Sequence, residues 1–387
     1  MLPGARTLCL VLALSAAAAA QVPAPAPGQA SPATGEAPRD LTAVLEALRS
    51  KHDLPALAGA IVSRGRLEAV GACGVRERGS DVAVTVEDRF HLGSCTKAMT
   101  ATLCALLVEK QALSWDSTAP EFLADAVGDP RPAWKQVTLA HLLSNRGGAP
   151  AHLEANGLWG ELWASKEAPA LQRLALARGV LTQEPLAPPG EKYVYSNAGF
   201  SLAGAMAERA AKCDFEELMR RELFAPLGMT SAGFGPPGDG KTLDQPRGHT
   251  AEGQPVPWGR AADNPAAIAP AGRVHCSIGD WAKFVALHLD GKGDRPRLLT
   301  AESLARLHTP AAGPGERYAL GWLVTERPWA GGTVLTHSGS NTMWFAVAWL
   351  APKKDFAVLV CCNQGGDRAQ RACDDAAGAL IGAHVPR

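Results

Sequence analysis

The two ends of the chain carry matching patterns of helix and strand. Near the start, four apolar side chains share one helical stripe, Leu41, Val44, Leu45 and Leu48, and residues 57–75 form two apolar runs around a polar turn at 63–66. Near the end, residues 332–339, 344–351 and 356–363 are strand-like runs, and residues 367–383 form a closing helical pattern. This arrangement predicts one antiparallel sheet built from both ends of the chain and flanked by terminal helices.

The middle of the chain has a different pattern. Residues 94–230 contain mostly helical periodicities broken by Gly/Pro loops, and residues 231–272 are rich in Gly and Pro, which indicates a long loop region. The predicted fold class is therefore α/β (α+β): an antiparallel sheet with terminal helices and an inserted helical lobe at about residues 95–260.

The first 39 residues are expected to lie outside this fold. Residues 1–20 contain one cation, Arg6, then a short apolar run and small residues, which is typical of a secretory signal peptide. Residues 21–39 are rich in Pro and Ala and indicate a linker. We expect an exported protein, periplasmic or secreted, with one domain at residues 40–387 and no stable membrane span after cleavage.

Composition excludes some classes of partner. The 38 basic and 38 acidic residues give a net charge of zero, without the basic excess that a nucleic-acid-binding protein shows. The eight cysteines after the signal include no C-x-x-C pair and no Cys/His ligand spacing, so a structural zinc is not expected. The chemistry that the motifs below indicate needs no metal or organic cofactor. Cys104 and Cys361 lie in apolar runs and are expected to be buried free thiols; the pairing of the other six stays open.

The first candidate for chemistry is Ser94 with Lys97, at the start of a predicted helix. Side chains three residues apart share a helix face, and a lysine can activate a serine if burial keeps its amine neutral. The helix start also offers N–H groups that can hold an oxyanion. The alternative is a helix cap at Ser94 and a solvated charge at Lys97.

A second motif, Y-x-N, combines Tyr195 with Asn197. A phenol near a lysine can relay protons, and an asparagine amide can orient both a substrate carbonyl and the lysine. The chain has only three tyrosines, so a chance occurrence of this motif is less expected than one of S-x-x-K. The alternative is an aromatic anchor beside a helix cap.

The third motif leads out of a strand and consists of His337, Ser338 and Gly339. The glycine permits close approach of a substrate, the next N–H, that of Ser340, can serve as an oxyanion donor, and the imidazole can bond substrate or the catalytic hydroxyls. This H-x-G pattern is weak alone, because it also occurs at His91. The alternative is a histidine at a strand end without a role in chemistry.

In this order, the three motifs resemble those of the penicillin-recognising serine hydrolases, which include class C β-lactamases, DD-peptidases and related esterases. The segments "HLLSNRGGAP", "PLGMTSAGF" and "PAGRVHCSIGDWAKF" are also similar to family segments. The resemblance spans about residues 40–385. It implies a β-lactamase/transpeptidase-like fold, catalysis by Ser94, Lys97 and Tyr195, and substrate binding by the residues Asn197, His337, Ser338, Gly339 and Ser340.

Two residues depart from the family pattern. His337 stands where lactamases of this class usually have lysine, and a mostly neutral imidazole anchors a carboxylate poorly. Arg273 replaces a usual glycine, and either intrudes on the site or supplies a positive charge there. The expected function is that of a serine hydrolase acting on a β-lactam, a D-amino-acid peptide or a small ester through an acyl-enzyme on Ser94, with esterase or D-peptidase activity favoured. The alternative is a non-catalytic peptidoglycan- or peptide-binding receptor with the same fold.

Overall fold

A computed structural model describes residues 37–154, 157–289, 297–315 and 317–384 of the chain. The chain divides into two units, residues 1–37 and 38–387, and all described helices and strands belong to the second. The expected signal peptide, and the expected linker up to residue 36, lie outside the described residues. Arg39, the last residue of the expected linker, already pairs with Ala69 in a strand.

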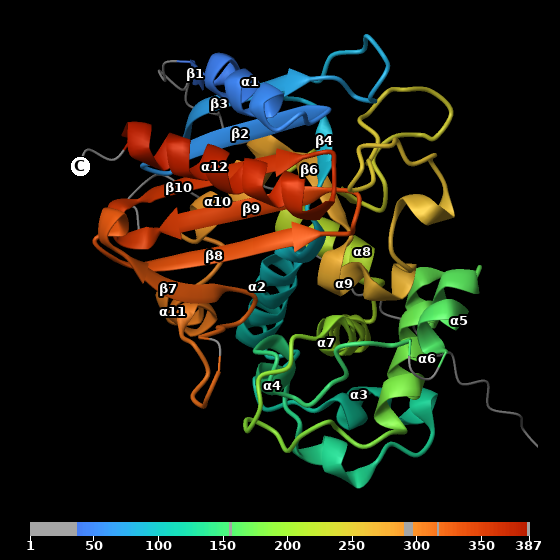
Figure 1. Ribbon diagram of the computed structural model, residues 1–387. Coiled ribbons are helices and arrows are strands. Elements are labelled where there is room, and N and C mark those ends of the chain that lie inside the picture. Colours follow the sequence, from blue (N-terminus) through green and yellow to red (C-terminus); the bar gives the residue numbers. More distant parts are fainter. Residues whose placement is uncertain (1–36, 155–156, 290–296, 316, 385–387) are drawn as a thin grey trace, which may run out of the picture. The chain divides into compact units, whose positions relative to one another are not determined.

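The central element is a seven-stranded sheet built from both ends of the domain, as predicted (Figure 1). Its strands lie in the spatial order β1 (Arg39–Asp40), β3 (Arg66–Gly74), β2 (Ala56–Ser63), β10 (Phe356–Cys362), β9 (Phe345–Ala351), β8 (Gly332–Ser340) and β7 (Leu323–Arg327). Every neighbouring pair is antiparallel except β1 with β3, which is parallel. The predicted antiparallel sheet is therefore mixed, because this two-residue strand enters in the same direction as its neighbour.

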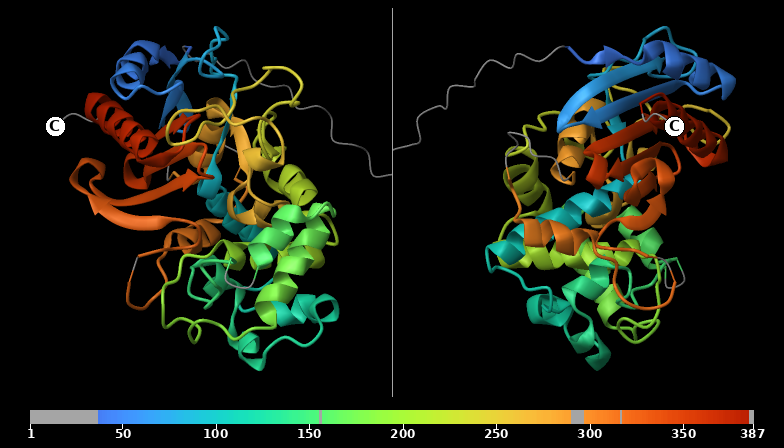
Figure 2. Two further views of the ribbon diagram at one scale, coloured as in Figure 1. Left: turned by 45° about the vertical axis from the view of Figure 1, so that its right-hand side comes forward. Right: turned by 90° about the vertical axis from the view of Figure 1, so that its left-hand side faces the viewer.

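Helices cover both faces of this sheet. The terminal helices α1 (Thr42–Lys51) and α12 (Gly366–His384) pack together on one face, as Figures 1 and 2 show, and α10 (Ile278–Leu287) packs on the other. Leu45 of α1 is fully buried against the sheet, whereas Val44 is 39% exposed, so the predicted apolar stripe of this helix is narrower than its sequence indicated.

The helical lobe follows β4 (Arg89–His91). In chain order, its elements are η1 (Gly93–Cys95), α2 (Thr96–Glu109), α3 (Ala119–Val127), η2 (Pro132–Gln136), α4 (Leu139–Leu143), α5 (Leu158–Ala164), α6 (Pro169–Leu181), α7 (Asn197–Ala211), α8 (Phe215–Met219) and η3 (Arg220–Phe224). The predicted loop region holds β5 (Gly233–Phe234), η4 (Arg260–Ala262), η5 (Ala266–Ile268) and α9 (Ala269–Gly272). The remaining elements are β6 (Val274–Ser277), α11 (Ala301–His308), η6 (Pro328–Ala330) and η7 (Pro352–Lys354). Strands β4, β6 and β5 form a separate small sheet.

Helix α2 is the central helix of the domain. All its residues from Thr96 to Leu107 are buried, so it is enclosed on every side rather than on one stripe. It contacts α7, α9 and α11 (Figure 1). A residue at its start is therefore held in a fixed position between the sheet and the helical lobe.

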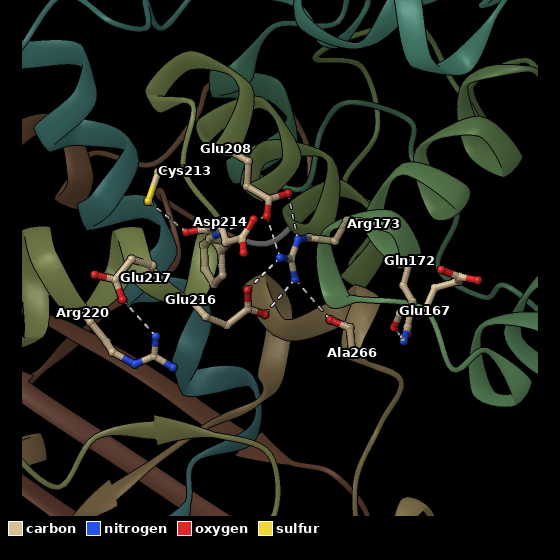
Figure 3. Close-up of polar contacts among 11 residues, drawn as sticks. Glu167, Gln172, Arg173, Glu208, Cys213, Asp214, Glu216, Glu217, Arg220 and Ala266 are labelled. Carbon is tan, nitrogen blue, oxygen red and sulfur yellow. Dashed lines mark hydrogen bonds and ion pairs between the residues drawn. The ribbon is translucent and has the colours of Figure 1, made fainter.

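A buried ion cluster joins three helices of the lobe (Figure 3). The guanidinium of Arg173 on α6 is fully buried, and it donates paired hydrogen bonds of 2.6–2.9 Å to Glu208 of α7 and Glu216 of α8. It also donates to the carbonyl of Ala266 at 3.4 Å. Since a buried arginine needs such partners, this cluster fixes the packing of these helices.

Two cysteines in apolar runs are buried free thiols, as predicted. The eight described cysteines are free thiols, and both Cys104 and Cys361 are buried, which confirms the prediction for these two. Burial also raises the pKa of the Cys104 thiol to about 12.

Candidate active site

Ser94 lies in the tight turn η1 that leads into α2. Its neighbours Gly93 and Cys95 are buried, whereas Ser94 itself keeps partial solvent exposure. Gly93 has φ +50, a left-handed conformation that a residue with a side chain rarely adopts. The turn therefore requires a glycine before the serine, and it presents the hydroxyl at the start of a rigid helix.

Strand β8 runs against this turn through a second glycine. A Cβ on Gly339 would lie 2.6 Å from the nitrogen of Ser94, and a Cβ on Gly93 would lie 2.4 Å from the nitrogen of Ser340. The backbones of the two segments can approach this closely only because neither glycine carries a side chain. Ser338 and Ser340 are exposed, so the strand end brings the N–H groups of Ser94 and Ser340 to the same solvent-accessible region.

Lys97 is fully buried and joins three segments of the site. Its Nζ lies 3.1 Å from Oγ of Ser94, 2.7 Å from Oδ1 of Asn197 and 2.8 Å from the carbonyl oxygen of Ala271. It also lies 4.6 Å from the centre of the Tyr195 ring. This position excludes the alternative of a solvated surface charge.

Burial lowers the pKa of Lys97 to about 7, because the charged amine loses its hydration inside the protein. A neutral amine has two N–H donors and one lone pair. Asn197 Oδ1 and the carbonyl of Ala271 are acceptors for the two donors, which leaves the lone pair to accept the hydroxyl proton of Ser94. The contacts of Lys97 thus match those of a base poised beside a serine.

Tyr195 lies beside the same hydroxyl. Burial raises the pKa of its phenol, and a hydrogen bond with Ser94 acts in the opposite direction without cancelling that effect. The phenol therefore stays protonated near neutral pH. Of the two groups that contact Ser94, Lys97 is suited to accept a proton and Tyr195 to donate one.

The loop that carries Tyr195 is held by Asn145, which the sequence patterns did not single out. The carbonyl of Asn145 accepts from the N–H of Val194 at 2.8 Å, and its Oδ1 accepts from the N–H of Ser196 at 3.0 Å. These bonds hold the peptide groups on either side of Tyr195. Asn197 then begins α7, with Ser196 as the helix cap, so its amide faces Lys97 from a fixed helix end.

His337 is brought into the site, but its imidazole faces a partner that the sequence patterns did not indicate. Its Nδ1 lies 2.6 Å from the carbonyl oxygen of Ser338, which can only accept, so Nδ1 carries the proton. Nε2 therefore accepts from the hydroxyl of Tyr318 at 2.9 Å. The expected bond from this imidazole to the catalytic hydroxyls is not made, although its ring centre lies 6.3 Å from that of Tyr195.

Burial and the nearby charge of Lys97 lower the pKa of His337 to about 4, so the imidazole is neutral at physiological pH. Its partner Tyr318 is 2% exposed. The three tyrosines of the chain, Tyr193, Tyr195 and Tyr318, all gather here, with ring centres of Tyr193 and Tyr318 5.8 Å apart. The scarcity of tyrosine was a signal that could have drawn attention to Tyr318.

Arg273 does not intrude on the site. Its Nε donates to Oδ2 of Asp263 at 3.0 Å, so the side chain turns away from Ser94. Oδ1 of Asp263 lies 3.1 Å from Nε2 of His91 and accepts from Asn341 at 3.1 Å. Although burial acts to raise it, the pKa of Asp263 lies well below its usual range because its carboxylate interacts with the imidazole of His91 and the guanidinium of Arg273.

His91, the second histidine of an H-x-G pattern, supports the turn at Ser94. Its Nδ1 accepts from the N–H of Gly93 at 3.1 Å. The buried carboxylate of Asp263 therefore links segments that precede Ser94, follow Ser340 and follow Ala271. It is a shared anchor for these three segments of the site.

The described part of the chain offers neither a metal site nor a membrane span. Among residues 37–384, apart from the undescribed positions, no group of three or more His, Cys, Asp and Glu side chains is arranged to hold a metal ion. No helix within the same described ranges is both long enough and apolar enough to cross a bilayer.

The sheet, the inserted helical lobe and the serine–lysine pair at the start of the central helix define the class of β-lactamase/transpeptidase-like proteins. A family model described as Beta-lactamase matches residues 41–383. The chain belongs to the β-lactamase family, which confirms the resemblance found in its motifs.

Relatives within the family differ in how much of their length is matched. Penicillin-binding protein 4 of Amycolatopsis lactamdurans is 28% identical over 335 residues, which cover 83% of this chain and 84% of that protein. Unguisins hydrolase ungD of Aspergillus violaceofuscus is 28% identical over 272 residues, which cover 66% of this chain and 45% of that protein. The chain thus spans less than half the length of this second relative.

Solved structures show the same fold. The octameric penicillin-binding protein homologue from Pyrococcus abyssi superposes with a TM-score of 0.71 at 24% identity, over 88% of this chain and 76% of that one. The β-lactamase/D-alanine carboxypeptidase from Pseudomonas syringae has a TM-score of 0.70 at 20% identity, over 89% of this chain and all of that one. At these identities the likeness establishes the fold.

Proposed function

We propose that this protein is a serine hydrolase that cleaves an ester or amide through an acyl-enzyme on Ser94. The observation that carries the proposal is the buried amine of Lys97, 3.1 Å from Oγ of Ser94, with a pKa lowered to about 7. A pure binding site has no need for a neutral lysine beside a hydroxyl. Lysine bases of this kind are expected where a serine must be activated.

The geometry supports the following sequence of steps. Lys97 accepts the hydroxyl proton while Oγ of Ser94 bonds to the substrate carbonyl carbon. The N–H groups of Ser94 and Ser340 stabilise the oxyanion, and Tyr195 donates a proton to the departing alkoxide or amine. Water then attacks the acyl carbon and gives a proton to the phenolate of Tyr195, and the ammonium of Lys97 returns a proton to Oγ of Ser94 as the acid departs, so all three side chains regain their resting state.

An ester, or a D-peptide that places no carboxylate beside His337, fits the site better than a β-lactam does. His337 occupies the position at which the β-lactamases resembled here have a cation, and its pKa of about 4 leaves it neutral. A neutral imidazole already bonded to Tyr318 offers little attraction to the carboxylate of a β-lactam. The relative named unguisins hydrolase supports hydrolysis as the reaction.

Export of the protein is part of the proposal and depends on residues 1–20. Their pattern is typical of a cleaved signal peptide, and cell-wall peptides or small esters would then be encountered outside the cytoplasm. Fractionation of cells that produce the full chain, followed by N-terminal sequencing of the mature protein, tests both cleavage and location.

The test of the chemistry is covalent labelling. The purified protein is treated with a fluorophosphonate probe and with fluorescent penicillin, and Ser94→Ala is compared with Ser50→Ala, a change at an exposed serine on the opposite face of the sheet. We expect labelling of the wild type and of Ser50→Ala but none of Ser94→Ala. Undiminished labelling of Ser94→Ala would exclude Ser94 as the nucleophile, and penicillin binding without covalent labelling or turnover would favour the receptor alternative.

The same preparations, supplied with nitrocefin, a D-Ala-D-Ala peptide and short-chain esters, identify the substrate class. We expect turnover of the short-chain esters to exceed that of nitrocefin. Efficient hydrolysis of nitrocefin would contradict the argument from His337.

A further inference from the structure

The side chain of Arg273 connects the candidate active site with a cavity of about 160 Å³. The backbone just before it belongs to the site, because the carbonyl of Ala271 accepts from Lys97 at 2.8 Å. A Cβ on Gly272 would lie 3.7 Å from the nitrogen of Ser94. The cavity is thus about one arginine side chain away from the serine.

Asp263 orients this guanidinium. The carboxylate binds Nε of Arg273 at 3.0 Å and is itself held by His91 and Asn341, so its position is fixed. Neither η nitrogen of Arg273 donates a hydrogen bond to the residues that the structure describes, and the side chain is 16% exposed. The two η nitrogens therefore form a fork that is free to bind a ligand, and such a fork matches the two oxygens of a carboxylate.

The lining of the cavity carries a net positive charge. Arg260 and Arg273 contribute two cations, and Asp263 contributes one anion, which gives +1 among the charged side chains of the lining. The guanidinium of Arg260 donates to the carbonyls of Ala164 and Ser165 at 3.0 and 3.2 Å, which places its charge at the wall. Such a cavity attracts an anion.

Other parts of the lining are apolar or neutral. The indole of Trp163, 37% exposed, contributes an aromatic wall, and Gln172 and Ala266, both drawn in Figure 3, are also part of the lining. The cavity therefore has room for a short carbon chain beside the guanidinium. Arg273 also provides the permanent cation that the neutral imidazole of His337 does not.

We propose that this cavity is a substrate subsite in which Arg273 binds a carboxylate of the ester or peptide that Ser94 attacks. The inference rests on the proposed function, since it assigns a substrate class to the same site. The carboxylate belongs either to the acyl part of the substrate or to its leaving group, and paired substrates distinguish these two sources.

The kinetic test uses two matched pairs of esters. For the acyl part, p-nitrophenyl hydrogen glutarate is compared with p-nitrophenyl valerate; for the leaving group, 4-acetoxybenzoate is compared with its methyl ester. In one of the two pairs, the ratio of kcat/KM for the acidic ester over the neutral one should fall about tenfold in Arg273→Met, the factor that one lost charged contact is worth. A general loss of activity in the variant lowers kcat/KM for both esters of a pair equally, so it does not change their ratio.

Three variants control for effects on folding. Asp263→Asn combined with Arg273→Met removes both buried charges and should reduce the same ratio, whereas Arg273→Lys, which keeps the charge but not the fork, should reduce it less. Arg209→Met, at an exposed arginine paired with Asp125, should leave the ratio at the wild-type value. An unchanged ratio in Arg273→Met for both pairs overturns the subsite.

A binding measurement separates failure of the subsite from failure of the proposed function. Glutarate is titrated into wild type and Arg273→Met by calorimetry, with no turnover required. Binding that is lost in Arg273→Met supports the subsite even if no ester is hydrolysed, in which case only the proposed function fails. Ester hydrolysis with neither glutarate binding nor a preference for acidic esters overturns the subsite and leaves the proposed function intact.

Discussion

The hydroxyl of Tyr318 lies 2.9 Å from Nε2 of His337 and joins a loop after α11 to strand β8 beside the candidate active site. Both side chains are at least nine-tenths buried, and the Ser338 carbonyl holds the other ring nitrogen. The imidazole is thereby fixed in one tautomer and one orientation. Its neutral form, rather than a cation, faces the region of Tyr195.

Replacing Tyr318 with phenylalanine should leave the buried Nε2 of His337 without a donor. An unpaired buried acceptor costs about 1–3 kcal/mol, so the free energy of unfolding should fall by about this amount in urea denaturation. A double-mutant cycle with His337→Ala separates the bond from other effects of the ring. Additive losses in this cycle would contradict a direct bond between the two side chains.

The rate of ester hydrolysis should increase as the pH rises through about 7. The pKa of Lys97 is lowered to about 7 by burial, and only the amine without its extra proton can accept the hydroxyl proton of Ser94. A plot of kcat/KM from pH 5.5 to 8.5 should show this rising limb, and Lys97→Met should lose about 10²- to 10⁴-fold in rate. A flat profile in the wild type would argue against Lys97 as the base.

Gly339→Ala should disrupt the contact between β8 and the turn at Ser94. Its Cβ would lie 2.1 Å from the carbonyl oxygen of Leu92, so one of the two backbones must move. A displacement of about 1 Å at a catalytic group can cost about 10²-fold in rate, which steady-state kinetics would detect. As a control, Gly378→Ala in α12 meets nothing within 4 Å and should retain activity and gain about 0.5–1 kcal/mol of stability.

Arg173→Met should strongly destabilise the helical lobe. The change leaves the buried carboxylates of Glu208 and Glu216 without their cation, which typically costs about 3–5 kcal/mol. Thermal and urea unfolding measure the loss, and adding Glu208→Gln and Glu216→Gln should recover part of it. The exposed pair of Arg209 with Asp125 is the matched control, since Arg209→Met should change stability by less than about 0.5 kcal/mol.

Moderate acid should destabilise the fold through buried histidines. Burial lowers the pKa of His275, His308 and His337 to about 4 each, against about 6.5 in an unfolded chain. Between pH 4 and pH 6.5 the unfolded chain binds more protons than the folded chain. The stability that comes from keeping these histidines neutral is therefore fully present above pH 6.5 and is lost as the pH falls toward 4. The expected slope is about 1.4 kcal/mol per pH unit for each such group.

Urea unfolding at pH 7.5 and at pH 5.0 measures this fall in the free energy of unfolding. Both pH values lie above the pKa values of ordinary carboxylates, so the difference reports mainly on the histidines. His308→Gln, which removes one of the buried groups, should reduce the difference between the two pH values. His152→Gln, at a side chain that is 86% exposed, should leave it unchanged. Equal stability of the wild type at both pH values would contradict the assignment of neutral buried histidines.

Sequence patterns predicted the regular elements and the catalytic motifs because both are encoded over short distances. The hairpin of β2 and β3 and the strands β8, β9 and β10 follow from apolar runs bounded by polar turns, and they lie within one or two residues of the expected bounds. The spacing of Ser94 and Lys97 also places them on one helix face without knowledge of the rest of the fold.

The environment of each site residue was decided only by tertiary packing. No local pattern shows that Lys97 loses all contact with water, that Tyr318 bonds His337, or that Arg273 turns toward Asp263. Each of these contacts joins segments distant in the chain, and a pKa depends on the burial and charges that such contacts create. The sequence by itself determined which groups are available for chemistry, and the packing of the two lobes decided their protonation, their partners and the direction in which they point.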